Sequence, residues 1–148
     1  MAVMYTEAGV SMVLTFDKMA DARDHLKDLY DSAQSGVPAV VQRSDDPAVA
    51  MVRLDSLKRL LRSSCPIDPQ IRFGEQSVSV WLPGFPVSAQ GADFEAAASE
   101  FVAALRDYAE TWVEDLRHYP NHAENWGLVN LVQLSDDAEL LRHAFGEE

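Results

Sequence analysis

The sequence has a single cysteine, Cys65, among its 148 residues. One thiol cannot form an intramolecular disulfide, so we expect the chain to fold on its apolar core alone, in a reducing compartment such as the cytoplasm. No apolar run approaches the roughly 20 residues that span a bilayer. The N-terminus also lacks a basic region followed by an apolar segment. The sequence therefore predicts neither secretion nor a membrane partner.

Motifs for catalysis and cofactor binding are missing too. The sequence has no serine nucleophile elbow, phosphate loop or dinucleotide fingerprint. His118, His122 and Glu124 lie close together, but Pro120 interrupts the helix that an i, i+4 pair of metal ligands needs. We therefore expect no catalytic residue, no metal and no other cofactor. An enzyme whose carboxylates meet only on folding is a distant alternative.

Positive charge is scarce, and it is unevenly distributed. The chain has 12 Lys and Arg against 24 Asp and Glu, a net charge of −12. Residues 1–70 hold eight basic against ten acidic residues, whereas residues 71–148 hold four against fourteen. A chain this acidic repels nucleic acid at long range, so any DNA contact needs a local basic face in the first half. The acidic second half suits a basic protein partner or a solvated, solubilising surface.

The first half begins with a β-branched and aromatic run, SMVLTF at residues 11–16, which predicts a strand. Asp17 follows as the expected N-cap of a helix. Apolar residues then recur at three- and four-residue steps as far as Ala33, and Gly36 is suited to the left-handed conformation that ends many helices. The pattern predicts one amphipathic helix directly after the strand.

A β-hairpin and a second helix complete this half. The runs VPAVVQR and PAVAMV predict two strands around the turn at residues 44–46. Asp55 is expected to cap a short helix over residues 56–62. A β-α-β-β-α unit of about 50 residues buries little apolar surface. We therefore expect it to form a homodimer.

Two stretches, ADARDHLKDLYDSAQSG and VPAVVQRSDDPAVAMVRLDSLKRLL, together resemble the Phd/YefM, or prevent-host-death, family of bacterial type II antitoxins. The resemblance covers residues 11–62. It consists of an Ala-Arg-x-x-Leu motif, a helix that ends in Gly, a short hairpin and a Leu-rich second helix. It implies a module that dimerises and binds the operator DNA of its own operon, joined to a more variable part that wraps and silences a toxin.

The same resemblance implies DNA-binding residues. Arg23 matches the family's arginine at the start of the first helix, where a guanidinium can approach phosphate or a guanine edge. Lys18, Lys27 and Arg43 are further candidates on proximity alone, although each could equally be a solubilising surface charge. The hairpin turn, SDDP, departs from the Gly-containing and often basic turn of the family. We therefore expect the hairpin tip to avoid DNA and to contact a protein instead.

The second half follows a Pro-containing linker, SSCPIDPQ at residues 63–70. A new unit is expected to begin near Ile71. Apolar and other residues alternate over residues 77–82 before Pro83 and Gly84, which predicts a hairpin or a bent strand pair. From Asp93 the apolar residues follow a helical period, which predicts a helix of on the order of 25 residues.

This order of strands and long helix faintly resembles the HicB-like antitoxin fold, which supports an α+β second unit and transfers no residues. Beyond Pro120, Asn121 is a candidate helix cap and Ser135 is expected to cap a last helix. The segment between them is too apolar for a free tail. It either completes the core of the second unit or anchors a partner, and the sequence leaves both open.

The sequence thus predicts an α+β protein with a Phd/YefM-like dimerisation and DNA-binding module at residues 1–66 and a toxin-binding unit at residues 67–148. The resemblance to the Phd/YefM family implies an antitoxin that neutralises a protein toxin and can regulate its own operon. We expect the toxin to be basic and to bind the second half, because that half combines negative charge with aromatic side chains. The alternative is a protein-interaction module or subunit without DNA binding. The second half holds all three tryptophans, and the candidate toxin-binding residues are Trp112, Trp126, Leu128 and Val132.

Overall fold

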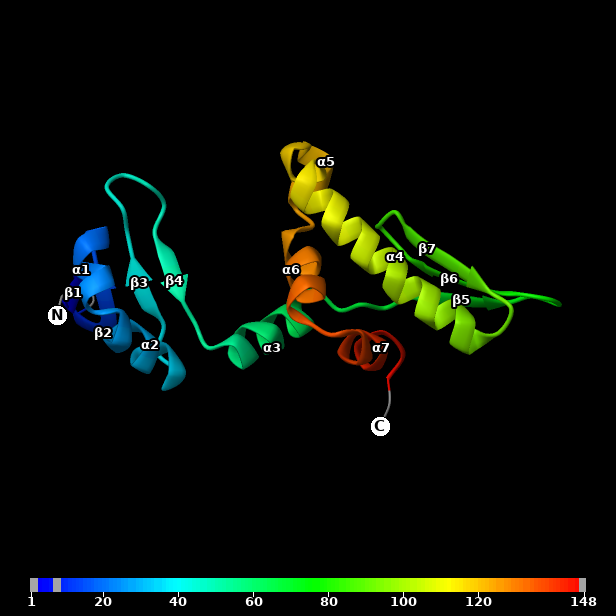
Figure 1. Cartoon of the computed structure of the whole chain (residues 1–148), viewed down its shortest axis with the longest axis horizontal. Coiled ribbons are helices and arrows are strands. Elements are labelled where there is room, and N and C mark those ends of the chain that lie inside the picture. Colours follow the sequence, from blue (N-terminus) through cyan, green and yellow to red (C-terminus); the bar gives the residue numbers. More distant parts are fainter. Residues whose placement is uncertain (1–2, 7–8, 147–148) are drawn as a thin grey trace. The chain divides into compact units, whose positions relative to one another are not determined.

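The computed structural model describes residues 3–6 and 9–146 (Figure 1). Its contacts divide the chain into two compact units, Met1–Leu57 (unit 1) and Lys58–Glu148 (unit 2). The division falls within helix α3, Leu54–Ser64. Both units combine helices with a small β-sheet, which confirms the predicted α+β class.

Unit 1 contains a four-stranded sheet whose strands lie in chain order. Its two outer pairs are antiparallel, whereas β2 and β3 run parallel because a helical segment connects them. The first strand, β1, has no counterpart among the predicted strands, and the other three match the prediction in order. The strands are β1 (Val3–Thr6), β2 (Gly9–Phe16), β3 (Ala39–Val41) and β4 (Val49–Met51).

The helical segment of unit 1 is broken in two, so the prediction of a single helix is wrong. Helix α1 spans Met19–Asp24 and α2 spans Leu26–Gln34. The ring of His25, the residue at the break, stacks on Phe16 of the sheet, with ring centroids 5.1 Å apart. Both the His25 amide, at 3.1 Å, and the ring Nδ1, at 2.8 Å, lie within hydrogen-bond distance of the Asp21 carbonyl oxygen.

Two of the N-caps predicted for helices of unit 1 are not at the predicted residues, whereas the predicted helix end at Gly36 is confirmed. The N-cap of α1 is Lys18 and not Asp17. Asp55 lies inside the first turn of α3 instead of before it. Gly36 has φ +98°, the left-handed conformation expected after α2. The hairpin turn is also as predicted, and Ser44 within it has φ +49°.

The core of unit 1 is described for residues 13–57. Its buried cluster consists of Leu14, Phe16, Ala22, Leu29 and Ala39, against which Val41 and Met51 pack while half-buried, and Ala33 of α2 is buried as well. Three of these six buried residues are alanines, so the apolar area that they remove from water is limited.

Unit 2 contains a three-stranded antiparallel sheet in the order β5-β6-β7. The strands are β5 (Gln70–Phe73), β6 (Val78–Leu82) and β7 (Val87–Gly91). The predicted alternation is confirmed, because Val78, Val80 and Leu82 are buried. The sequence predicted a hairpin or a bent pair, and the structure has a third strand, β5, in addition.

The long helix α4 spans Phe94–Glu114 and packs along β7 and β6 (Figure 1). Its predicted cap is confirmed, since Asp93 accepts a hydrogen bond of 2.8 Å from the Ala96 amide. Gly91, at the end of β7, lies directly beneath the first turn of α4. A β-carbon at this position would lie 2.7 Å from the Ala96 carbonyl carbon, closer than packed atoms approach.

Four short helical segments follow α4, which ends earlier than predicted. They are η1 (Leu116–His118), α5 (Pro120–Ala123), α6 (Trp126–Leu134) and α7 (Asp137–Phe145). No helix within residues 3–6 and 9–146 has the length and apolar character that a membrane span requires.

The two caps predicted for this region are wrong. Asn121 lies inside α5, whose N-cap is Tyr119. Ser135 ends α6, and its neighbour Asp136 caps α7 in a reciprocal capping box with Glu139. Asp136 can accept from the Glu139 amide while the Glu139 side chain reaches back, which explains why the cap lies one residue later.

Candidate interaction surfaces

The first candidate surface is an apolar groove in unit 1, between helices α1 and α2 and the β3–β4 hairpin. It has a volume of about 540 Å³. Its apolar lining includes Met19, Leu26, Leu29, Val41, Val49 and Met51. Leu26 is 58% exposed and Val49 is 68% exposed, so the small core leaves these side chains in water. Soluble monomers rarely expose an apolar patch of this kind, and such a patch usually marks a site where a partner binds.

The four predicted DNA-binding residues lie on or near this groove, and three of them have acidic neighbours. Arg23 and Arg43 line the groove itself. The Nε atom of Arg23 is 3.4 Å from the Asp24 carboxylate, and that of Arg43 is 2.9 Å from the Asp46 carboxylate. These pairs are exposed, so each contributes only about 0–1 kcal/mol and could exchange for another anion.

The remaining two basic candidates lie on the same helical segment. Lys27 Nζ is 2.6 Å from the Asp31 carboxylate one turn later, and the hydrogen bond to Asp31 raises the pKa of Lys27. Lys18 is exposed at the N-cap of α1. Unit 1 as a whole has five Lys or Arg against nine Asp or Glu, so these residues act within a net charge of about −4.

The second candidate surface is the corner of unit 2 where α4 ends and α5 and α6 begin, at residues 110–126, which we call the aromatic corner. Trp126 is 55% exposed at the start of α6, and Tyr119 and Val113 are exposed nearby in the sequence. Four acidic residues on the same segment are exposed, namely Glu110, Glu114, Asp115 and Glu124. The corner therefore combines an aromatic side chain with negative charge.

The other predicted toxin-binding residues belong to the core. Trp112, Leu128 and Val132 are buried, so the segment after Pro120 completes the core of unit 2 while Trp126 points outward. Trp112 donates a hydrogen bond of 2.8 Å from Nε1 to the His122 carbonyl oxygen, which fixes α5 against α4. These three side chains support the corner from inside.

A buried polar network also supports the aromatic corner. The Tyr108 hydroxyl lies 3.0 Å from His122 Nδ1 and accepts a hydrogen bond of 2.6 Å from the Asn125 amide. These contacts engage His122, one of the histidines considered as a metal ligand. Among the described residues, no group of three or more His, Cys, Asp or Glu side chains is placed to hold a metal ion.

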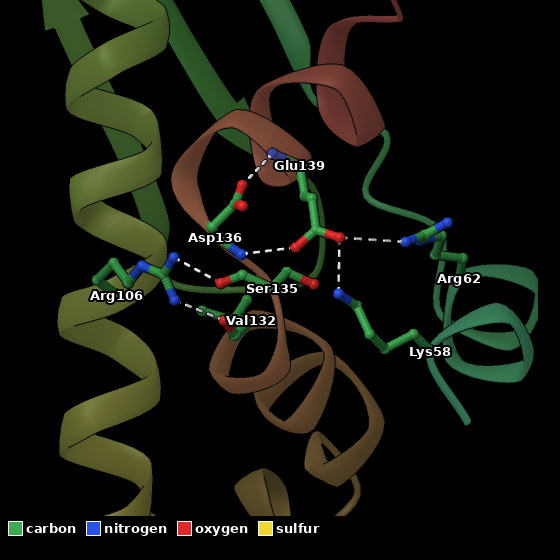
Figure 2. Close-up of polar contacts among 7 residues, drawn as sticks. All are labelled: Lys58, Arg62, Arg106, Val132, Ser135, Asp136 and Glu139. Atoms are coloured by element: carbon green, nitrogen blue, oxygen red, sulfur yellow. Dashed lines mark hydrogen bonds and ion pairs between the residues drawn. The ribbon is translucent and has the colours of Figure 1, made fainter. Parts of the chain in front are cut away.

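A second polar network holds the C-terminal helices of unit 2 (Figure 2). Arg106 of α4 donates to the Val132 and Ser135 carbonyl oxygens at 2.6 and 2.7 Å, which satisfies backbone acceptors at the end of α6. Glu139 of α7 accepts from Lys58 of α3. The hydrogen bond from Lys58, followed by that from the Asp136 amide, holds the pKa of Glu139 below its ordinary value.

Three features of the structure were not predicted from the sequence. Tyr119 lies on the aromatic corner, and its signal in the sequence was the Tyr-Pro step that begins α5. Ile71 and Phe73 of β5 are exposed apolar residues on an outer strand, and no local pattern distinguished them from core residues. Gly127 approaches Cys65 so closely that a β-carbon would overlap the sulfur, a contact between distant parts of the chain.

Comparisons with known proteins give two matches of different kinds. The family model PHD_like, described as antitoxin of toxin-antitoxin, RelE / RelB, TA system, matches residues 12–141. The fold is similar to a crystal structure from Syntrophomonas wolfei subsp. wolfei that is described as the antitoxin part of a proposed toxin/antitoxin system. The TM-score is 0.74 at 16% identity, over 93% of this chain and 99% of that chain. At this identity the likeness concerns the fold alone. The comparison with curated proteins gave no match.

Proposed function

Because the chain belongs to the PHD_like family of toxin–antitoxin antitoxins, whose model matches residues 12–141, we propose that it neutralises a cognate protein toxin by binding it directly. Unit 2 is the toxin-binding part. The sequence predicted toxin binding at residues 67–148, and unit 2 of the structure begins nine residues earlier, at Lys58. The Phd/YefM subtype also remains a prediction.

The observation that carries this proposal is the exposure of Trp126 among acidic residues. A tryptophan that is 55% exposed leaves a large apolar surface in water, and burial in an interface removes that cost. Unit 2 has seven Lys or Arg against fifteen Asp or Glu, a net charge of about −8, which attracts a basic protein. Aromatic anchors surrounded by polar rims are typical of binding hot spots.

The test is binding of the full chain to the protein encoded by the adjacent open reading frame. Trp126→Ala should weaken this binding by on the order of 30-fold, the effect of losing a hot-spot side chain. Trp81→Ala is the matched control, because Trp81 is also exposed in unit 2 but belongs to strand β6, outside residues 110–126. Equal affinity of the Trp126 variant and the wild type would contradict the proposal.

We further propose that the groove of unit 1 is covered by a second copy of the chain. Support comes from its apolar lining and from the small core beside it. Arg23 and Arg43 line this groove, so a DNA site on the homodimer requires their side chains, which are 78% and 72% exposed in the single chain, to lie at the rim of the interface. Binding to operator DNA, and thus regulation of the toxin–antitoxin operon, is the second part of this proposal.

The operator proposal has a specific alternative, a protein-interaction module without DNA binding. The ion pairs of Arg23, Lys27 and Arg43 with acidic neighbours favour that alternative. Titration of DNA from upstream of the gene at low salt separates the two. We expect Arg23→Ala to weaken binding by about 1–3 kcal/mol and Arg117→Ala, in unit 2, to leave it unchanged. Failure to bind at low salt would leave the interaction module alone.

A further inference from the structure

Strand β5 of unit 2 is an outer strand with an unusually exposed set of side chains. It pairs with β6 on one side, and the sheet order β5-β6-β7 leaves its other edge open (Figure 1). All four residues of Gln70–Phe73 are exposed. Phe73 is 70% exposed and Ile71 is 39% exposed. Open strand edges invite pairing with another chain, and proteins usually protect them.

The two apolar residues project from the helix-covered face of the sheet. Ile71 lies opposite Val80 and Phe73 lies opposite Val78, and residues directly opposite in an antiparallel pair share a face. Val78 and Val80 are buried on that face, where α4 covers β6 and β7. Ile71 and Phe73 therefore extend the apolar face of unit 2 beyond the edge of α4.

The register also determines which backbone groups point outward. The Gly74 amide donates to the Ser77 carbonyl at 2.8 Å, so this pair is of the hydrogen-bonded type. Hydrogen-bonded and non-hydrogen-bonded pairs alternate in antiparallel sheets. Arg72 and Gln70 consequently bond to β6, whereas the amides and carbonyls of Ile71 and Phe73 point away from it. Apolar side chains and outward donors and acceptors thus coincide at the same two residues.

We propose that β5 binds an extended segment of the toxin as a fourth strand of this sheet. The inference rests on the proposed function, since the occupant is the toxin. The added strand would use the two outward amides and two outward carbonyls of Ile71 and Phe73. Its own apolar side chains, at alternate positions, would cover these two residues on the helix side of the sheet.

The charges on and beside β5 favour the toxin, rather than a second copy of this chain, as the binding partner of this strand. Asp68 and Glu75 flank β5 and are exposed, so the ends of the strand favour a segment with basic flanks. An antiparallel pair of two β5 strands that used all the outward groups would place Arg72 opposite Arg72 of the other copy. Like charges directly opposite each other destabilise strand pairing. The acidic flanks of the two copies would also approach one another.

Proline substitution at an outward-facing position tests this edge contact. Ile71→Pro removes an outward amide donor and no hydrogen bond to β6, but it also fixes φ at about −65° and replaces the side chain, so a control proline is needed. The same alternation points the Gln90 amide of β7 away from β6, so Gln90→Pro is the matched control on the opposite edge. This control also loses the exposed hydrogen bond from the Gln90 side chain to Ser77 Oγ. Phe73→Ser removes apolar surface and leaves the backbone unchanged. Circular dichroism and thermal melting establish that each variant is folded.

The binding partner in this experiment is the protein encoded by the adjacent open reading frame, and the full chain is used. Ile71→Pro and Phe73→Ser should each weaken binding about tenfold or more, because a toxin carbonyl or apolar side chain loses its partner. Gln90→Pro should bind within about threefold of the wild type. In the wild-type complex, hydrogen exchange at the Ile71 and Phe73 amides should slow.

The outcomes distinguish the inference from the proposed function. If the wild type binds and Trp126→Ala weakens binding, but the β5 variants and the hydrogen exchange of β5 are unchanged, then β5 pairing is overturned and the proposed function stands. If the wild type does not bind this protein at all, both fail together. If Ile71→Pro proves unfolded, Phe73→Ser and the exchange rates of the wild-type complex decide the matter.

Discussion

Glu139 Oε1 lies 2.6 Å from Lys58 Nζ, although 81 residues separate the two in the sequence. Arg62 Nη2 lies 3.7 Å from the same carboxylate oxygen, so two bases of α3 face one acid of α7. Both side chains of the Lys58–Glu139 pair are largely shielded from solvent, which reduces screening by salt. The contact attaches α3 to the last helix of unit 2.

The stability of unit 2 should fall in two steps on acidification. Burial, with a smaller contribution from Arg62, lowers the pKa of His143 below its ordinary 6.5. The unfolded chain then binds a proton more readily than the folded one, so stability decreases as the pH falls from 6.5 towards the folded pKa. Glu139 has a lowered pKa relative to 4.5, so its stabilisation is present above pH 4.5 and is lost as the pH falls through its folded pKa.

Melting temperatures of the full chain between pH 7.5 and 3 measure this effect. His143→Phe should abolish the step that begins near pH 6.5, and Glu139→Gln should reduce the step below pH 4.5. Within the described part of the chain, the buried Nε2 of His143 has no hydrogen-bond partner, so the aromatic replacement sacrifices no bond. A wild-type melting temperature that is constant from pH 7.5 to 5 would contradict the first step.

Loss of the Arg106 guanidinium should destabilise unit 2. Arg106→Met retains the apolar stem but leaves the Val132 and Ser135 carbonyls without this donor, which should cost about 2 kcal/mol. Arg117→Met, an exposed arginine in η1, is the control and should change the free energy of unfolding by less than about 0.5 kcal/mol. Urea denaturation measures both, and equal midpoints for the two variants would refute the assignment.

Gly127→Ala should stabilise the protein less than a glycine-to-alanine change in a helix usually does. Alanine can gain up to about 1 kcal/mol in helix propensity, but its β-carbon would overlap the Cys65 sulfur, so the Cys65 side chain must rotate to make room. In a Cys65→Ala background Gly127→Ala should show the full gain, whereas a Cys65→Ser background should show less of it. Additive effects of Gly127→Ala and Cys65→Ala in a double-mutant cycle would exclude this contact as the cause.

The groove of unit 1 makes a prediction about association. Leu26→Glu places a charge in the groove and should weaken self-association at least tenfold, because a buried unpaired charge is costly. Tyr30→Glu is the control, since Tyr30 is equally exposed on α2 but does not line the groove. Sedimentation of each full-length variant at about ten micromolar, a concentration at which weak dimers typically form, measures the difference in self-association. A wild type that stays monomeric at this concentration would reject the dimer.

Sequence patterns correctly predicted the features that depend on residues close together in the chain. The alternation of Val78, Val80 and Leu82 and the cap at Asp93 depend on neighbours within a few residues, and both are confirmed. The caps at Asp17 and Ser135 are each one residue from the observed cap. Ser135 and Asp136 are adjacent residues that can both cap a helix, whereas Lys18 makes no side-chain cap hydrogen bond and only marks where the helical conformation of α1 begins.

Local patterns in the sequence did not predict the break at His25 or the third strand β5. His25 lies between α1 and α2, and its ring contacts Phe16, which belongs to the sheet. The groove of unit 1 similarly arises from residues in two helices and a hairpin that meet only in the folded state. These contacts join residues of different helices and strands, so no short stretch of the sequence reveals them.

Helical geometry alone does not assign the exposed position of Trp126. At about 100° per residue, Trp126 lies about 200° from Leu128 but only about 60° from Val129, and both of these residues are buried. Leu128 and Val132 share a face at i, i+4 spacing and belong to the core. The core alternative therefore holds for these two residues, whereas an anchor at Trp126 remains a proposal.

The contact beneath the first turn of α4 has a consequence for sequence variation. At position 91 any side chain would meet backbone atoms of α4, which cannot rotate away as a side chain can. Gly84 needs its positive φ but faces open space, so asparagine could replace it at small cost. We therefore expect that relatives which keep this fold retain glycine at position 91, while the turn at position 84 is free to vary in length and residue type.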